Sequence, residues 1–215
     1  MIAYISVIMK GITVTLGAWL LTSCASLLIG TLLGIISCRY LGSAKLISII
    51  RMYTFVAKGI PAYVQILIAY FIVPALLGVN IPAFAAACGA LAFCSSGYTT
   101  EIMRAGINAI PRGQWDACAT LGYPLSAQLK RIILPQAFKT IAPALGGELE
   151  QLLKSTSLLA TIGITELTRT GMNIISRELN PVPVYLTIAG LYLVFSAMLG
   201  AVLMYSERRF LYGQR

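Results

Sequence analysis

Three ionisable side chains stand close together in one long, mainly apolar stretch of the sequence. Glu148, Glu150 and Lys154 fall near the middle of residues 136–162. A charged group at the centre of a segment that crosses a lipid bilayer costs several kcal/mol, so such a group usually serves a function. Two kinds of chemistry are available here. A carboxylate can hold an ammonium or guanidinium group of a ligand, or it can be neutralised by a neighbouring lysine.

If residues 136–162 form a helix, the polar residues divide between two faces. At about 100° per residue, Glu148, Gln151 and Ser155 lie within roughly 60° of one another. Glu150 and Lys154 form an i,i+4 pair on nearly the opposite face and can neutralise each other. We therefore interpret Glu150–Lys154 as a structural ion pair and Glu148, with its two neighbours, as a candidate site for a cationic substrate. The alternatives for Glu148 are an ion pair with an arginine across the bundle and a place at a dimer interface.

The sequence lacks the residues that most catalytic and metal sites use. It contains no histidine, its five cysteines form no C-x-x-C pair, and it has no G-x-x-x-x-G-K-[ST] nucleotide motif. Imidazole catalysis, histidine metal sites and nucleotide binding by a P-loop are thereby excluded. We expect no catalytic residue, no metal site and no cofactor in this chain.

The composition is that of an integral membrane protein. Of the 215 residues, 58% are hydrophobic and only 11% are charged, whereas about a quarter are charged in a soluble domain. About 20 apolar residues suffice for one membrane-spanning helix. We predict an all-α fold and a single domain over residues 1–215, with five spans at about 12–37, 62–77, 83–103, 136–162 and 184–205. Residues 104–135 connect the third and fourth spans, and 163–183 form a mixed loop.

The basic residues predict which side each segment faces. Most of the 16 lysines and arginines lie after the first span, after the third span and in the C-terminal tail, which holds Arg208, Arg209 and Arg215. Cytoplasmic segments carry the excess of Lys and Arg. The N-terminus is therefore expected outside and the C-terminus in the cytoplasm. This topology explains the net charge of +9 better than nucleic-acid binding does.

The connection 104–135 contains the signals of a short helix. Pro111 suits a helix start, and Gly122 followed by Tyr123-Pro124 ends it. Trp115, Ala119 and Leu121 can supply an apolar patch. A short amphipathic helix between two spans is suited to docking in a groove of another protein. The alternative from periodicity alone is an interfacial helix that lies on the bilayer.

This connection resembles the EAA loop of ABC-importer permeases, which reads E-A-A, three residues, Gly, nine residues, then I-x-L-P. The chain has Asp116-Ala117-Cys118, Gly122 and Ile132-Ile133-Leu134-Pro135 at the same spacing, with Asp for Glu and Cys for Ala as departures. Four further stretches are similar to the polar-amino-acid branch of these permeases: Gly11–Leu16, Lys58–Gln65, Gly97–Gly106 and Lys154–Leu167. In the second stretch, the usual R-G-T-P is replaced by Lys58-Gly59-Ile60-Pro61.

The resemblance implies a permease subunit of the bacterial inner membrane with specific partners. These are a cytoplasmic ABC ATPase dimer, which would bind ATP and Mg²⁺, a second permease copy or a sister permease, and a periplasmic solute-binding protein. The ATPase-coupling residues implied by the motif are Trp115, Asp116, Ala117, Cys118, Ala119, Leu121 and Gly122. Such a subunit is not itself an enzyme.

We expect a polar, cationic amino acid or a related amine or opine as the substrate, on the strength of Glu148. Glu101 and Arg104 are expected to form a structural ion pair that braces the coupling loop. Glu166 and Arg169 could pair similarly or contact the binding protein. The functional alternatives are an ATP-independent channel or secondary transporter and, less favoured, a membrane-embedded enzyme.

Overall fold

The computed structural model describes residues 4–212, with side chains up to residue 205. All regular elements in this range are helices, as predicted. The α-helices are α1 (Ile5–Ile36), α2 (Ala44–Gly59), α3 (Ala62–Leu67), α4 (Val73–Leu77), α5 (Ala83–Ala109), α6 (Arg112–Thr120), α7 (Leu125–Gln128), α8 (Leu134–Ser155), α9 (Leu167–Glu178) and α10 (Pro181–Tyr212). Short π-helical segments, Ile68–Ile72 and Leu129–Ile133, and a 3₁₀ segment, Thr156–Ile162, join some of them.

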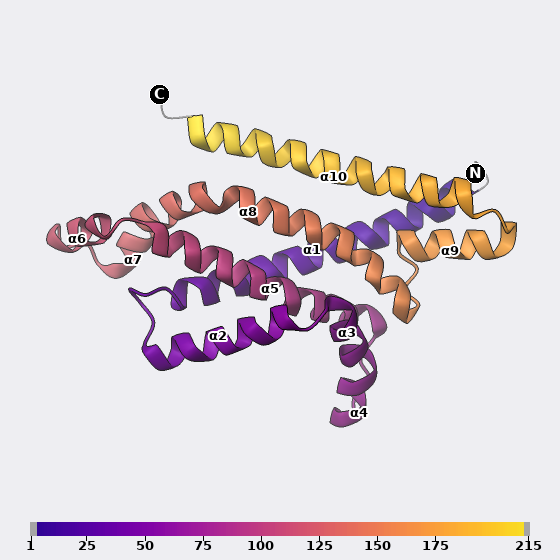
Figure 1. Cartoon of the computed structure of the whole chain (residues 1–215), viewed down its shortest axis with the longest axis horizontal. Helices are drawn as coiled ribbons and strands as arrows, with labels where there is room; N and C mark the ends of the chain where they lie inside the picture. Colours follow the sequence, from indigo (N-terminus) through magenta and orange to yellow (C-terminus); the bar gives the residue numbers. More distant parts are fainter. Residues whose placement is uncertain (1–3, 213–215) are drawn as a thin grey trace.

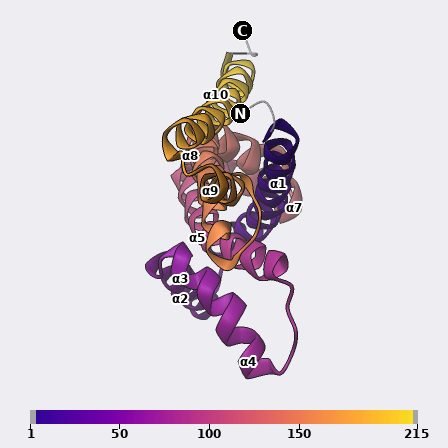
Figure 2. The same cartoon turned by 90° about the vertical axis from the view of Figure 1, so that its right-hand side faces the viewer.

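Four long helices, α1, α5, α8 and α10, run along the long axis of the molecule, and α2 accompanies α5 (Figure 1). The short helix α6 lies at one end and α9 at the other. In the end view, α4 projects from the bundle on the side opposite α10 (Figure 2). Within the described range, α1 and α10 are each long and apolar enough to cross a membrane. The predicted orientation also used Arg208, Arg209 and Arg215, whose side chains lie outside the described ones.

The helices α1 and α5 pack closely because small residues line their contact. A Cβ atom at Gly30 would overlap the side chain of Thr99, and one at Gly34 would overlap Met103. Hydroxyl groups join the same two helices, since Ser26 Oγ donates a hydrogen bond to Ser95 Oγ at 2.9 Å. This close contact holds α5 firmly against α1.

The segment between the first two predicted spans was expected to be a loop, but residues 44–59 of it are helical. They form α2, which begins at Ser43, whose side chain accepts a hydrogen bond from the Leu46 amide. The helix packs along α5, where Gly97 allows the approach of Ala57. Basic residues such as Lys58 on one face of α2 lowered its apparent hydropathy and hid the helix from a sequence reading.

The predicted span 62–77 is the second arm of a bent pair. The axis turns by 98° between α2 and the arm formed by α3 and α4. Pro61 has no amide hydrogen, so the carbonyl of Ala57 lacks its helical donor. The buried side chain of Gln65 replaces that donor: its Nε2 lies 2.8 Å from the Ala57 oxygen and 2.7 Å from the Ile60 oxygen. The bend is therefore held by a side-chain amide.

The remaining boundaries also differ from the predicted spans. The third predicted span continues as α5 to Ala109, and the fourth consists of α8 followed by a 3₁₀ segment that ends at Ile162. Part of the predicted loop 163–183 is the helix α9. The bundle axis extends beyond the apolar core of α5, so hydropathy alone ended that helix too early.

Glu166 was expected to pair with Arg169 or to contact a binding protein, and the structure gives it a different role. Its side chain is completely buried and caps α9, accepting hydrogen bonds from the backbone amides of Thr168 at 2.8 Å and Arg169 at 2.7 Å. Tyr192 on α10 also donates to it, at 3.0 Å. Burial raises the pKa of Glu166, and the hydrogen bonds oppose that shift. A carboxylate buried in this way joins α9 to α10 and is not available to a binding protein.

Candidate functional site

A polar cavity of about 380 Å³ lies between the bend that follows α2, the middle of α5 and the second half of α8. Glu148, Gln151 and Ser155, the three residues that helical spacing placed on one face, all line it. Lys58 from α2 and Tyr98 from α5 complete its polar wall. We call this space the substrate cavity, after the role that we propose for it below. The structure thus brings the three predicted residues together and adds Lys58, Ser95 and Tyr98, which the sequence did not assign to this site.

Glu148 is half-buried and has a hydroxyl partner. Ser95 Oγ donates to Glu148 Oε1 at 2.6 Å, and Ser95 in turn accepts from Ser26 of α1. Trp19 Nε1 donates to the carbonyl of the adjacent Leu149 at 2.9 Å, which fixes this turn of α8 against α1. Among the side chains described up to residue 205, no lysine or arginine forms an ion pair with Glu148. An oriented carboxylate without a cation is suited to bind one.

Lys58 is the cation of the substrate cavity. Its Nζ lies 5.9 Å from the centre of the Tyr98 ring and forms no ion pair with the carboxylates of the described residues. The cavity therefore contains an acid and a base that do not neutralise each other directly. Lys58 begins the stretch Lys58–Gln65, which is similar to the permease family, and this similarity was the one sequence signal for the lysine. Because Lys58 was expected in a loop, the sequence did not place it in this cavity.

Glu150 and Lys154 lie outside the substrate cavity. Lys154 Nζ is 2.7 Å from Glu150 Oε1, one helical turn away. Because the two side chains neutralise each other, neither is a free charge. The helical spacing of α8 places this pair on nearly the opposite face from Glu148. That the pair has a structural role stays a prediction.

Glu101 and Arg104 also form an ion pair on the face of α5 that is turned toward α2. Thr54 of α2 donates a hydrogen bond to the other oxygen of the same carboxylate, Glu101 Oε1, at 3.0 Å. This contact ties α2 to α5 about one helical turn from the substrate cavity, in the direction of α6. A structural function for the pair was predicted, and the partner on α2 is visible only in the tertiary structure.

The helix α6 has the boundaries that its sequence predicted. It starts after Pro111, and Gly122, with φ of 71°, follows its end in the left-handed conformation that glycine adopts readily. The amide of Tyr123 donates to the carbonyl of Cys118 at 3.0 Å, which closes the last turn. Substitution of Gly122 by any residue with a Cβ atom would strain this ending.

The two faces of α6 differ. Trp115 and Cys118 are 7% and 2% exposed and face the body of the protein. The Trp115 ring stacks on Tyr40, with ring centres 4.5 Å apart. The predicted exposed patch therefore does not include Trp115, because its indole packs against the segment that joins α1 to α2. Trp115 anchors the helix instead.

The outward face of α6 contains the other residues implied by the motif. Asp116, Ala117, Ala119, Leu121 and Gly122 are exposed, and the Leu121 side chain is 73% exposed. Asp116 Oδ2 lies 3.6 Å from Arg112 Nε in a solvent-exposed pair that contributes little to stability. An exposed apolar residue beside a fixed short helix provides a surface for a partner. Whether these residues contact an ATPase stays a prediction.

An all-helical bundle with long apolar helices, a polar cavity within it and a protruding short helix at one end defines a membrane transport subunit. Residues 7–212 match the family described as the binding-protein-dependent transport system inner membrane component. The chain belongs to this family of membrane permease components of ABC importers. Its members work with a binding protein and an ATPase, so the ATP-independent alternatives are not supported.

Named relatives share most of the chain. The arginine transport system permease protein ArtQ of Bacillus subtilis is 39% identical over 168 residues, which cover 78% of this chain and 76% of ArtQ. A putative glutamine transport system permease protein GlnP of Rickettsia felis is 36% identical, over 75% and 73% of the two chains. The octopine transport system permease protein OccM of Rhizobium meliloti is 34% identical, over 68% and 63%.

Solved structures have the same fold. One chain, from the crystal structure of an amino acid ABC transporter with histidines, has a TM-score of 0.86 and 35% sequence identity, over 97% of this chain and 96% of that one. A chain of the MetNI methionine ABC transporter in an inward-facing conformation has a TM-score of 0.84 over 97% and 98% of the two chains. At 16% identity, the latter shows the fold alone.

Proposed function

We propose that this permease carries a cationic amino acid, or a related amine or guanidine solute such as an opine, across the bacterial inner membrane. The observation that carries the proposal is Glu148, a carboxylate in the substrate cavity without a cationic partner in the described part of the chain. Gln151 and Ser155 supply neutral polar groups beside it. Relatives named for arginine and octopine transport, and a solved neighbour described with histidines, support the same substrate class.

Five spans, with the N-terminus outside, are the topology that best fits the arrangement of the helices. The end of α1 near α9 and the end of α10 near α6 lie at opposite ends of the bundle, as an odd number of crossings requires (Figure 1). We assign the first span to α1, the second to the bent pair of α2 with α3–α4, and the others to α5, α8 and α10. The α6 end is cytoplasmic in this assignment, consistent with the basic residues that surround α6.

ATP hydrolysis acts on the substrate cavity through α6. In this proposal, two permease chains, either copies or a sister pair, sit on a dimer of ABC ATPases that binds ATP and Mg²⁺. The exposed face around Asp116 and Leu121 docks on the ATPase, and the contact of Trp115 with Tyr40 passes its movement to α1 and α2. Rigid-body movement of this kind switches the cavity between outward-open and inward-open states. A periplasmic binding protein delivers the substrate.

Replacement of Glu148 by Gln tests the substrate assignment. In vesicles with the complete transporter, Glu148→Gln should reduce uptake of arginine far more than uptake of glutamine, because the amide retains the size and loses the charge. Glu150→Gln is the matched control, since Glu150 is an acid on the same helix that lies outside the substrate cavity. Equal losses for the two substrates would assign Glu148 to a structural role and refute the proposal.

A further inference from the structure

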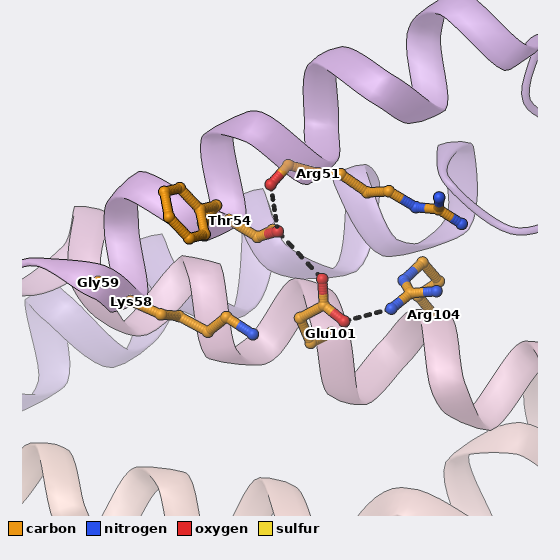
Figure 3. A pocket seen from close by; sticks show the side chains of 7 residues that line it. Arg51, Thr54, Lys58, Gly59, Glu101 and Arg104 are labelled. Atoms are coloured by element: carbon orange, nitrogen blue, oxygen red, sulfur yellow. Dashed lines mark hydrogen bonds and ion pairs between the residues drawn. The ribbon is translucent and has the colours of Figure 1, made fainter.

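A second polar cavity, of about 440 Å³, continues from the substrate cavity along the groove between α2 and α5 (Figure 3). Its polar wall consists of Arg51, Thr54 and Lys58 from α2 and Glu101 and Arg104 from α5. We call it the cationic pocket. Lys58 lines both cavities, so the two spaces adjoin at this side chain.

The lining of the two cavities winds around α5 as the helix advances. The substrate cavity is lined by Ser95 and Tyr98, and the cationic pocket by Glu101 and Arg104, at steps of three residues. At about 1.5 Å of rise per residue, Glu101 lies about 9 Å beyond Ser95 along the helix. Because α5 runs toward α6, the cationic pocket lies between the substrate cavity and the α6 end of the bundle (Figure 1).

The cationic pocket has an excess of positive charge. It contains three cations and one carboxylate, and that carboxylate is already occupied: Glu101 Oε2 pairs with Arg104 and Oε1 accepts from Thr54 at 3.0 Å (Figure 3). Among the described side chains, Arg51 and Lys58 form no direct ion pair, although Lys58 also acts electrostatically on Glu101, and Arg104 Nε makes no hydrogen bond. Three cations against one carboxylate leave this wall with a net positive charge, which attracts an anion.

The chemistry of these cations selects a carboxylate or phosphate. A guanidinium group offers two parallel N–H donors that match the two oxygens of such an anion, and an ammonium group adds a point charge. Arg51 supplies the first and Lys58 the second. On the other side of Lys58, Glu148 offers the opposite charge. The groove therefore presents a site for a cation followed by a site for an anion.

We propose that the cationic pocket binds the carboxylate of the transported amino acid as the substrate leaves Glu148 toward the α6 end. This inference rests on the proposed function for the class of cargo and for the cytoplasmic position of that end. Lys58 lines both cavities and contacts the carboxylate first. The carboxylate then moves from Lys58 to Arg51. The negative charge of the substrate is thus paired with a cation as it moves along the groove, which lowers the barrier to release. A lipid headgroup phosphate is the competing source of an anion with this chemistry.

Equilibrium binding of two ligands tests the proposal. Radiolabelled L-arginine and agmatine, which has the same guanidinium group and no carboxylate, are titrated onto the permease with its ATPase in phosphatidylcholine nanodiscs, without binding protein. Arginine should occupy two sites per permease, and agmatine only the one at Glu148. Arg51→Gln should weaken the arginine-only site about tenfold, equivalent to about 1.4 kcal/mol, and leave agmatine binding unchanged.

Two further variants separate charge from damage to the fold. Arg51→Lys retains the positive charge and should retain most of the arginine-only binding. Lys45→Gln removes an exposed cation of the same helix that lines neither cavity, and should change the binding of neither ligand. A loss of arginine-only binding in Lys45→Gln as large as that in Arg51→Gln would attribute the effect to overall charge and overturn the proposal.

The remaining outcomes distinguish this inference from the proposed function. If Arg51→Gln binds arginine as the wild type does, the cationic pocket does not hold the carboxylate, even where Glu148→Gln abolishes agmatine binding. If Glu148→Gln leaves agmatine binding intact while Arg51→Gln removes the arginine-only site, the assignment of Glu148 fails and the cationic pocket stands. Loss of the arginine-only site in nanodiscs with phosphatidylglycerol would identify a lipid headgroup as the occupant and refute the substrate as the source.

Discussion

The buried and exposed faces of α6 should respond differently to substitution. Trp115→Ala removes an indole that is 7% exposed and stacked on Tyr40 at 4.5 Å. Truncation of a buried tryptophan costs about 3–5 kcal/mol, and about 0.5–1.5 kcal/mol of that is stacking beyond burial. Because Trp115 Nε1 makes no hydrogen bond within the described residues, the loss is one of packing, and Trp115→Phe should retain most of the stability. Leu121, 73% exposed, should cost no more than about 0.5 kcal/mol as Leu121→Ala.

Three readouts on the complete transporter separate these effects: the melting temperature of the complex, retention of the ATPase on purification, and substrate transported per ATP hydrolysed in proteoliposomes. Trp115→Ala should lower the melting temperature and the transport per ATP, since α6 can still dock but no longer moves α1 and α2 with it. Leu121→Ala should leave the melting temperature unchanged and weaken ATPase retention.

Melting and transport of Trp115→Ala at wild-type levels would show that Trp115 does not anchor α6. A melting temperature of Leu121→Ala as low as that of Trp115→Ala would show that the inward and outward faces of α6 are assigned wrongly. Trp115→Phe serves as the control for the chemistry of the ring: near-normal coupling in this variant attributes the effect to the stack with Tyr40.

Three further outcomes are expected. Gln65→Leu leaves the carbonyls of Ala57 and Ile60 without their side-chain donor and should destabilise the permease by about 1–3 kcal/mol per buried group, measured as a lower melting temperature; an unchanged value would show that Gln65 does not hold the bend. Burial raises the pKa of Glu166, so its contribution to stability is fully present below the pKa of the unfolded chain and is lost as pH rises through the folded-state pKa; Glu166→Gln should remove this component from melting curves between acidic and neutral pH. Gly122→Glu places a side chain at φ of 71° and a charge on the docking face, and should abolish ATP-driven uptake while insertion in the membrane, followed by fractionation, is unaffected; normal uptake would contradict the coupling role of α6.

Local sequence signals were sufficient for several features of this protein. The ends of α6 follow from Pro111 and Gly122, because a proline fits a helix start and a glycine accepts the left-handed conformation after a helix end. The common face of Glu148, Gln151 and Ser155 follows from the helical repeat, and all three line one cavity. Each of these inferences requires only neighbouring residues along a single helix.

The same reasoning failed at α2 for a physical reason. Hydropathy averages over all faces of a helix, and α2 combines apolar residues with Arg51 and Lys58, which line the cavities beside it. The mean hydropathy of α2 therefore resembles that of a polar loop. The bend after α2 depends on the contact of Gln65 with the Ala57 carbonyl, which compensates for Pro61 and has no signature in a hydropathy profile.

Composition and neighbouring residues were enough to identify a helical membrane protein, to place Glu148, Gln151 and Ser155 on one face of α8 and to locate the ends of α6. The tertiary structure decided what those residues meet. It joined Lys58 to the cavity of Glu148, turned Trp115 onto Tyr40, and buried Glu166 against α10. Helical periodicity is a property of consecutive residues, whereas these contacts join residues tens of positions apart. Their geometry is set only when close packing of the helices fixes which side chains share a space.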